Sequence, residues 1–214
     1  MGRINRGNTT KLSIKLSARA RQNIDAAKKN LNLSAAGVIL FELTKIMDNP
    51  PSRTEVLSLE SKIDLENRHF PLTINKKISE MVNKLADDYD MKKNVLFGLI
   101  VSNHFENMDI ETRSDANPDK LFIQVNEQLK KKMIDYSEEN YIAMSGLVSY
   151  AILQGPYEGF PRYEGDETGD MFTSVPSYIK EIVKRRSQEM NIREHFFISL
   201  CLYKQFLSEE GRFT

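Results

Sequence analysis

Residues 11–43, KLSIKLSARARQNIDAAKKNLNLSAAGVILFEL, combine two periodicities in one short segment. Apolar residues first alternate with polar ones, at Leu12, Ile14 and Leu16, which is the period-2 pattern of a half-buried strand. After Ser17 the apolar residues recur at helical spacing. Serine is a residue type that caps a helix, because its side chain accepts a hydrogen bond from an early helical N–H. The segment therefore predicts a strand followed by helix.

The same pattern returns three more times along the chain. Strand-like alternation precedes Asn75, Asn126 and Pro176, and each of these residues is favoured or tolerated at a helix N-terminus. Counted from Ser17, Asn75, Asn126 and Pro176, apolar residues then recur at positions seven, sixteen, twenty-one and twenty-four. In the four copies they are Ile24, Leu33, Val38 and Phe41; Val82, Met91, Leu96 and Leu99; Met133, Ile142, Leu147 and Tyr150; Val183, Ile192, Phe197 and Leu200. Repeats this small bury little surface alone, so we expect them to pack against one another.

Each copy is predicted to form one strand and two helices, and a lone strand cannot satisfy its backbone hydrogen bonds. Two copies must therefore pair, each giving one strand to an antiparallel ribbon and two helices to a shared core. We expect a mainly α protein of four β-α-α repeats, in which the first copy pairs with the second and the third with the fourth. The connector at 52–67 spans up to about 55 Å when extended, which permits pairing within the chain. Pairing between chains is the alternative.

Breaks between the copies define the expected organisation. Asn49-Pro50-Pro51 ends the first copy, because proline cannot continue a helix. The connector after it has mild helical character at Thr54–Leu65. The expected parts are a flexible basic arm at 1–10, a first module at 11–107 with repeats 11–47 and 69–107, an acidic linker at 108–119, a second module at 120–207 with repeats 120–154 and 170–207, and a tail at 208–214.

The charge distribution is uneven although the net charge is zero, with 30 basic and 30 acidic residues. Zero net charge alone argues against a nucleic-acid partner. However, residues 1–34 carry eight Lys or Arg against the single Asp25, while 106–119 and 158–170 each carry five acids against one arginine. Basic units joined by acidic connectors can still present a strong local positive potential.

Several classes of protein are disfavoured. Cys201 is the only cysteine, so no disulfide forms within the chain, which fits a reducing cytoplasm. The N-terminus lacks the apolar core of a signal peptide, and no stretch has the eighteen or so apolar residues of a membrane span. His69, His104 and His195 have no metal-ligand spacing, and the chain has no phosphate-binding glycine loop or nucleophile elbow. We expect a cytoplasmic protein that is not an enzyme and has no cofactor or metal.

The residues and spacings above resemble tandem copies of the ribbon-helix-helix (MetJ/Arc-type) DNA-binding family, over roughly 150 of the 214 residues. The resemblance implies double-stranded DNA as a partner, with the ribbon in the major groove. It also implies base contacts from the strand positions two, four and six before each helix cap. These positions hold Lys15, Ser13 and Lys11; Thr73, Pro71 and His69; Gln124, Phe122 and Lys120; Ser174, Phe172 and Asp170. The candidate base contacts among them are Lys11, Ser13, Lys15, His69, Thr73, Lys120, Gln124 and Ser174.

The resemblance further implies phosphate contacts from backbone N–H groups at the start of each second helix, where the helix dipole favours an anion. The matching candidates are Ser34, Ala35, Lys92, Lys93, Ala143 and Arg193. Arg3 and Arg6 in the arm are further candidates, because basic arms reach phosphates or a minor groove. A solvated tail is an equally good interpretation of the arm.

Some outward residues depart from the family pattern. Pro71 lacks a ladder donor, so its strand is either frayed or has that position facing away from its partner. Outward Phe122 and Phe172 are apolar, and Asp170 would repel phosphate. The third and fourth copies therefore either bind DNA weakly or bury their ribbon against protein.

Fused, diverged units of this kind resemble the accessory proteins of plasmid relaxosomes. The implied function is sequence-specific DNA binding at a plasmid origin of transfer during conjugation, where the protein helps to seat a relaxase. The implied state is a monomer with internal pairing or a higher assembly on DNA. A transcriptional repressor or a centromere-binding partition protein is the alternative with the same chemistry. A hypothesis of another class makes the second half an antitoxin-like protein-docking module, to which Tyr157, Phe160 and Tyr163 of the connector could contribute.

Overall fold

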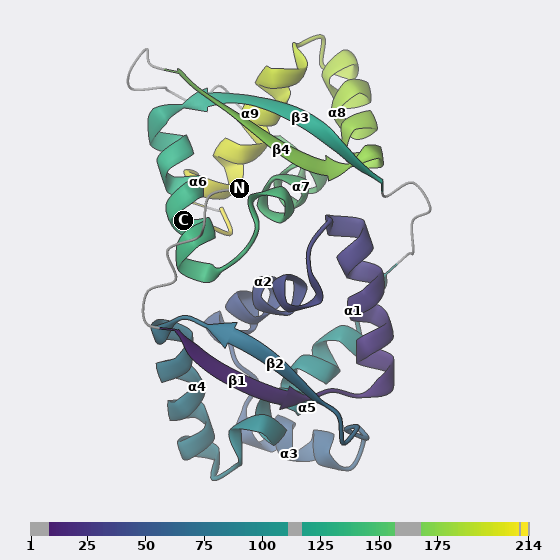
Figure 1. Ribbon diagram of the computed structural model, residues 1–214, viewed down its shortest axis with the longest axis vertical. Coiled ribbons are helices and arrows are strands. Elements are labelled where there is room, and N and C mark those ends of the chain that lie inside the picture. The colour runs from purple at the N-terminus through teal and green to yellow at the C-terminus, as the bar shows by residue number, and fades with distance from the viewer. Residues whose placement is uncertain (1–8, 111–116, 157–167, 210, 214) are drawn as a thin grey trace. The chain divides into compact units, whose positions relative to one another are not determined.

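The computed structural model describes residues 9–110, 117–156, 168–209 and 211–213. Its elements in chain order are β1 (Thr10–Lys15), α1 (Ala18–Leu31), α2 (Ala35–Asp48), α3 (Arg53–Glu60), β2 (His69–Ile74), α4 (Lys76–Tyr89), α5 (Lys93–Glu106), β3 (Pro118–Asn126), α6 (Glu127–Asn140), α7 (Met144–Gln154), β4 (Thr168–Pro176), α8 (Ser177–Glu189) and α9 (Glu194–Phe206). The protein is mainly helical, with two antiparallel two-stranded ribbons, β1 with β2 and β3 with β4 (Figure 1). The expectation of a mainly α protein with two short antiparallel ribbons is confirmed.

The chain divides into two compact units. The first unit comprises Met1–Lys28 and Ser34–Thr112, and the second comprises Lys29–Leu33 and Arg113–Thr214. Each unit contains one ribbon, and helices pack against one face of it (Figure 1). The other face of each ribbon therefore carries the side chains that the fold does not bury.

The helices that follow the strands begin at the predicted cap residues. The side chains of Asn75 and Asn126 each accept a hydrogen bond of 2.8 Å from the backbone N–H three residues further on. Ser17 does the same for α1 at 3.2 Å. Pro176 precedes α8 without a side-chain bond, which is tolerated because an N–H in the first turn has no intrahelical partner.

The alternating strand residues and the helical positions of the sequence pattern form the core. Leu12, Ile14 and Leu16 are 7% exposed or less. The sixteen apolar helix positions are buried except Met91, Tyr150 and Ile192, which are half-buried. Met91 and Ile192 follow the ends of α4 and α8, where the chain turns toward the next helix. Tyr150 instead lies beside Phe213, with the Arg212 guanidinium 4.7 Å from its ring centroid.

Helix α5 lies directly against the backbone of β1. A Cβ atom built on Gly98 would come well under 3.0 Å from the carbonyl oxygen of Lys15, so only glycine permits this approach. Glycine costs about 1 kcal/mol relative to alanine inside a helix. The close packing of α5 on the ribbon offsets that cost.

The strands are longer than predicted. β1 begins at Thr10 rather than Lys11, β3 at Pro118 rather than Lys120, and β4 at Thr168 rather than Asp170. The pairing of β3 with β4 continues from Pro118↔Pro176 to Asn126↔Thr168. Backbone pairing does not depend on side-chain polarity, whereas apolar alternation marks only the part of a strand that faces the core.

The connector between the first two copies contains a defined helix. α3 covers Arg53–Glu60 and not the whole of Thr54–Leu65, because the N–H of Lys62 and of Ile63 both bond the Leu59 carbonyl and close a turn there. A capping box fixes its start, in which Ser52 and Glu55 each accept a hydrogen bond from the other's backbone N–H. Its buried residues, Val56 and Leu59, join the core of the first unit.

Some predicted features lie outside the described residues. They are Arg3 and Arg6 of the arm, residues 111–116 of the acidic linker, and Tyr157, Phe160 and Tyr163 of the later connector. Among the helices in the described part of the chain, none has the length and apolar character needed to cross a membrane.

Cys201 in α9 provides a test of the second unit's packing. Its side chain is buried, and burial raises the pKa of the Cys201 thiol from 9.0 to about 12. Because the thiolate is the reactive form, we expect iodoacetamide at about pH 8 to leave the native protein unmodified and to alkylate the guanidinium-unfolded protein fully. Mass spectrometry of the intact protein measures both. Rapid alkylation of the native protein would show that α9 is not buried.

Candidate nucleic-acid interface

The two ribbons pair in the same register relative to their helices. In the β1–β2 ribbon Ser13 pairs with Pro71, and in the β3–β4 ribbon Phe122 pairs with Phe172. Each of these four residues lies four positions before the residue that precedes the next helix. The pairing is therefore symmetric about each central pair. Residues six positions before one of these preceding residues pair with residues two positions before the other.

The outer face of the β1–β2 ribbon brings together the five predicted base-contacting residues of the first module. Lys11 pairs with Thr73, and Lys15 pairs with His69, on either side of the central Ser13. Lys11, Ser13 and His69 are exposed, and Lys15 and Thr73 are half-buried. They alternate along the strands with the buried core residues, so all five project from the face opposite the helices. Two ammonium groups, two hydroxyls and an imidazole thus share one surface.

Pro71 does not interrupt this surface. β2 continues through Pro71, which pairs with Ser13. Antiparallel pairs alternate between hydrogen-bonded and non-bonded positions, and proline fits where its nitrogen faces away from the partner strand. Of the two alternatives for Pro71, the continuous strand is the one observed.

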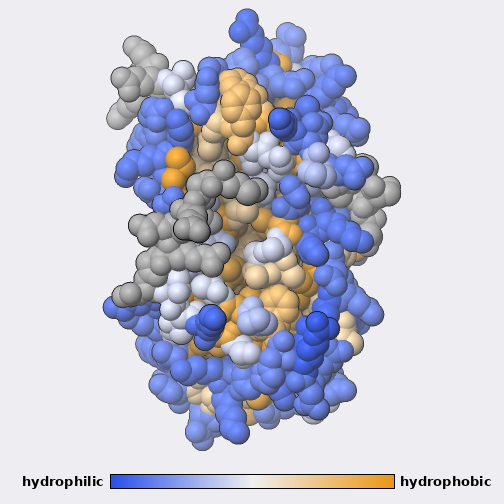
Figure 2. Space-filling view, in the orientation of Figure 1, coloured by the Kyte–Doolittle hydropathy of each residue, from blue (hydrophilic) through white to orange (hydrophobic). Residues whose placement is uncertain are grey.

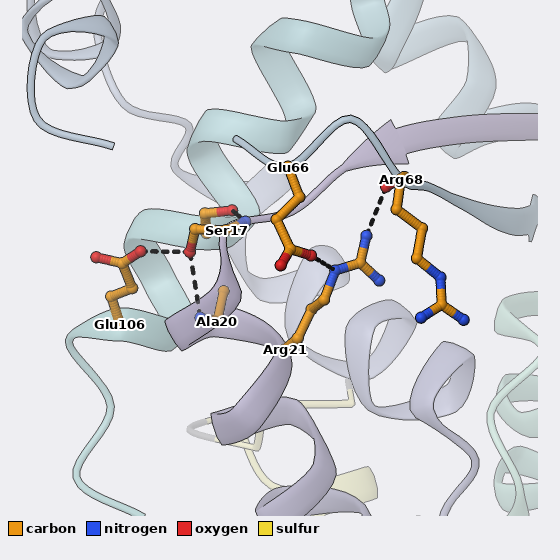
Figure 3. A network of polar contacts seen from close by, with 7 residues as sticks. Ser17, Ala20, Arg21, Glu66, Arg68 and Glu106 are labelled. Atoms are coloured by element: carbon orange, nitrogen blue, oxygen red, sulfur yellow. Dashed lines mark hydrogen bonds and ion pairs between the residues drawn. The ribbon is translucent and has the colours of Figure 1, made fainter. Parts of the chain in front are cut away.

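Polar contacts fix the end of the ribbon to the helices of the first unit (Figure 3). The Ser17 backbone N–H donates to the Ser102 hydroxyl at 3.0 Å. The Ser17 hydroxyl donates to the Glu106 carboxylate and accepts from the Ala20 N–H. One serine therefore caps α1 and ties the end of β1 to α5.

A second set of contacts holds the residues before β2 against α1. The Arg21 guanidinium lies 2.6 Å from the Glu66 carboxylate and donates to the Arg68 carbonyl oxygen at 2.5 Å (Figure 3). This segment then lies beside the end of β1, where the Lys15 ammonium donates to the Asn67 side-chain oxygen at 3.2 Å. The start of β2 is thereby positioned by α1 as well as by its strand partner.

A cavity of about 320 Å³ opens at this end of the ribbon. Its lining includes Arg21, Arg68, His69, Asp25 and Ala35, the first residue of α2. The N–H groups in the first turn of a helix have no intrahelical partner, and a guanidinium matches phosphate geometry. Arg68 is exposed and was not among the predicted contacts, because the prediction considered only the arm, the strand positions and the helix starts. A basic residue directly before a strand is the signal that identifies it.

The predicted phosphate-contacting residues lie at the starts of the second helices. Ser34 caps α2 by accepting a hydrogen bond of 3.0 Å from the Gly37 N–H. Lys92, Ala143 and Arg193 precede α5, α7 and α9, and none of the three makes a side-chain cap bond. Those four residues and Lys93 are exposed, and Ala35 is half-buried. The starts of α2, α5 and α7 are thus electropositive groups of N–H donors, whereas Glu194 places a carboxylate in the first turn of α9.

The outer face of the β3–β4 ribbon has a different chemistry. Lys120 pairs with Ser174, and Gln124 pairs with Asp170, whose carboxylate accepts a hydrogen bond of 3.3 Å from the Gln124 amide. Between these polar pairs lie Phe122 and Phe172, with ring centroids 5.2 Å apart. Figure 2 shows hydrophobic colouring at the surface over this ribbon. The three predicted base-contacting residues of the second module therefore share their face with an apolar centre.

No family model, curated protein or solved structure matches this chain.

Proposed function

We propose that this protein is a sequence-specific double-stranded DNA-binding protein built from four ribbon-helix-helix repeats. In this proposal the repeats pair within the chain into two modules, each resembling a dimer. The symmetric register of the two ribbons is the observation that carries the proposal, since it gathers the outward side chains of both strands on one face. A two-stranded ribbon fits the major groove of B-DNA, where such side chains read base edges.

The first ribbon has the chemistry for reading bases. The Lys11 and Lys15 ammonium groups donate to guanine O6 and N7, while the hydroxyls of Ser13 and Thr73 bond either donors or acceptors on base edges. His69 lies at the end of the ribbon, 3.3 Å from the Ser13 hydroxyl. These contacts would supply specificity.

Phosphate contacts would position the ribbon in the groove without reading sequence. Arg68, Arg21 and Ala35, the first residue of α2, line one cavity at the ribbon end together with the acidic Asp25, and the two guanidinium groups favour a phosphate there. The exposed starts of α5, α7 and α9 offer further N–H donors. Such contacts act locally, so zero net charge for the whole chain is compatible with DNA binding.

The four strands carry different outward residues, so each half-site would be read differently and the target would not be a perfect palindrome. A cytoplasmic, plasmid-encoded factor that marks an origin of transfer is the setting we propose. A repressor or a partition protein would use the same chemistry. Sequencing the genomic fragments that the protein retains distinguishes the three, because they predict a transfer origin, the protein's own promoter or a repeat array.

The test of DNA binding is selection of duplexes from a random library by the full-length protein. We expect enrichment of one asymmetric motif, bound at least about 10³-fold more tightly than a base-shuffled duplex. Sedimentation should find one chain per unbound particle. Equal affinity for the enriched and shuffled duplexes would contradict specific binding, and an obligate dimer would contradict pairing within the chain.

A further inference from the structure

The aromatic pair at the centre of the β3–β4 ribbon is largely exposed in the described part of the chain. Phe122 is 42% exposed and Phe172 is 74% exposed, although both lie within a regular ribbon. Their rings touch each other across the strands, at 5.2 Å between centroids and an interplanar angle of 48°. On the opposite face Leu121, Ile123 and Val125 of β3 are 3% exposed or less, and Met171 and Thr173 of β4 are half-buried. Among the described residues, nothing buries the outer side of the two rings, which are therefore accessible to a partner.

The residues around the rings favour DNA over a protein as that partner. Lys120, Gln124, Asp170 and Ser174 lie on the same outer face and place polar side chains on both sides of the two rings. A phenylalanine side chain buries at most roughly 250 Å², and two supply roughly 500 Å². A specific protein interface buries about 800 Å² on each partner and has an apolar core. A contact with the edge of a base pair buries far less apolar area, because the thymine methyl is the one apolar group exposed in the major groove.

We infer that Phe122 and Phe172 read thymine methyl groups at the centre of the second ribbon's binding site, an inference that rests on the proposed function. Base pairs are about 3.4 Å apart along the helix, and the ring centroids are separated by more than one such step. The two rings therefore contact methyl groups of neighbouring base pairs. The first ribbon has Ser13 and Pro71 at the equivalent central positions and carries no such aromatic pair.

The flanking residues extend this specificity. The Gln124 amide suits adenine N6 and N7, and Lys120 suits guanine O6 and N7. Asp170, which accepts a hydrogen bond from Gln124, could also accept one from cytosine N4. The Lys180 ammonium lies 3.1 Å from the Asp119 carboxylate, and this hydrogen bond lowers the pKa of Asp119. Lys180 is thus already paired beside this ribbon. We therefore expect the DNA bound by the second ribbon to have thymines at its centre, flanked by base pairs that these polar side chains can contact.

The test replaces single thymines of the selected duplex with deoxyuridine, which removes the methyl group and leaves the base-pairing edge unchanged. We expect the affinity of the wild-type protein to fall about fourfold at each central position of the second half-site, the equivalent of one buried methyl group. The variant Phe122→Ser/Phe172→Ser should bind the thymine duplex more weakly and should not distinguish thymine from uracil there. The control variant Leu153→Ser/Met190→Ser removes two other exposed apolar side chains of the second unit and should keep the discrimination.

Other outcomes overturn the inference. Equal discrimination by the wild type and the Phe122→Ser/Phe172→Ser variant would assign the methyl groups to another residue. Unchanged DNA affinity in that variant, with no uracil effect in the wild type, would assign the rings to a protein partner while leaving the proposed function intact. Absence of specific binding to any selected duplex would instead reject the proposed function itself. The uracil substitution alters only the DNA, so the wild-type result does not depend on how the variants fold.

Discussion

Replacement of Lys11 and Lys15 with alanine should lower the affinity for the selected duplex by about 30-fold to 10⁴-fold, since each good base contact contributes about 1–3 kcal/mol. Both side chains lie on the outer face of the β1–β2 ribbon, at symmetric distances from its central pair. Lys11 is exposed and Lys15 is half-buried, so neither ammonium group is needed to fill the core. Fluorescence anisotropy at fixed ionic strength measures the loss.

The matched control is Lys62→Ala/Lys84→Ala, which removes the same charge from exposed positions outside the ribbon. We expect this control to lower affinity only slightly, because distant surface charges are screened by salt. Equal losses in the two double variants would mean that total charge, and not the ribbon face, determines binding. Affinity for a shuffled duplex should change much less than affinity for the selected duplex in the Lys11 and Lys15 variant.

Replacement of Phe97 with alanine should lower the free energy of unfolding by about 3–5 kcal/mol, the usual cost of truncating a buried phenylalanine. Phe97 lies in α5, which packs against β1, and its side chain is 0% exposed. The matched variant Phe172→Ala removes the same atoms from a side chain that is 74% exposed. It should change the free energy of unfolding by only about 0.5 kcal/mol.

Urea unfolding of the full chain, followed by circular dichroism, compares these two variants. The large loss should appear in the transition of the first unit. A cost for Phe172→Ala as large as that for Phe97→Ala would show that the outer aromatic pair is part of the core, and that it is not available to a partner.

The sequence predicted those parts of the fold that depend on local patterns. Alternation at Leu12, Ile14 and Leu16 indicated a strand with one buried face, and the residue types at Asn75 and Asn126 indicated the helix starts. The capping box of α3 was also readable from the sequence, since Ser52 precedes Glu55 by three positions. Each of these signals involves residues close together in the chain.

Features that depend on contacts between distant residues could not be predicted in this way. Arg68 could be recognised as a basic residue directly before a strand, but its place at the cavity depends on Arg21 and Glu66, which hold its segment against α1. The first residues of β3 and β4 are in strands because each strand's backbone pairs with the other. The residues there show no apolar alternation that would have predicted a strand. The roles of the predicted DNA contacts remain predictions.

The central claim, that the outer face of a ribbon reads base edges, is tested most directly by amide NMR of the full chain. Spectra are compared with the selected duplex and with a base-shuffled duplex of equal length. We predict that the amide signals of β1 and β2 shift with the selected duplex, and that those of α3, which lies outside the ribbon, do not. Tight, specific binding that leaves the signals of both ribbons unchanged would contradict the claim.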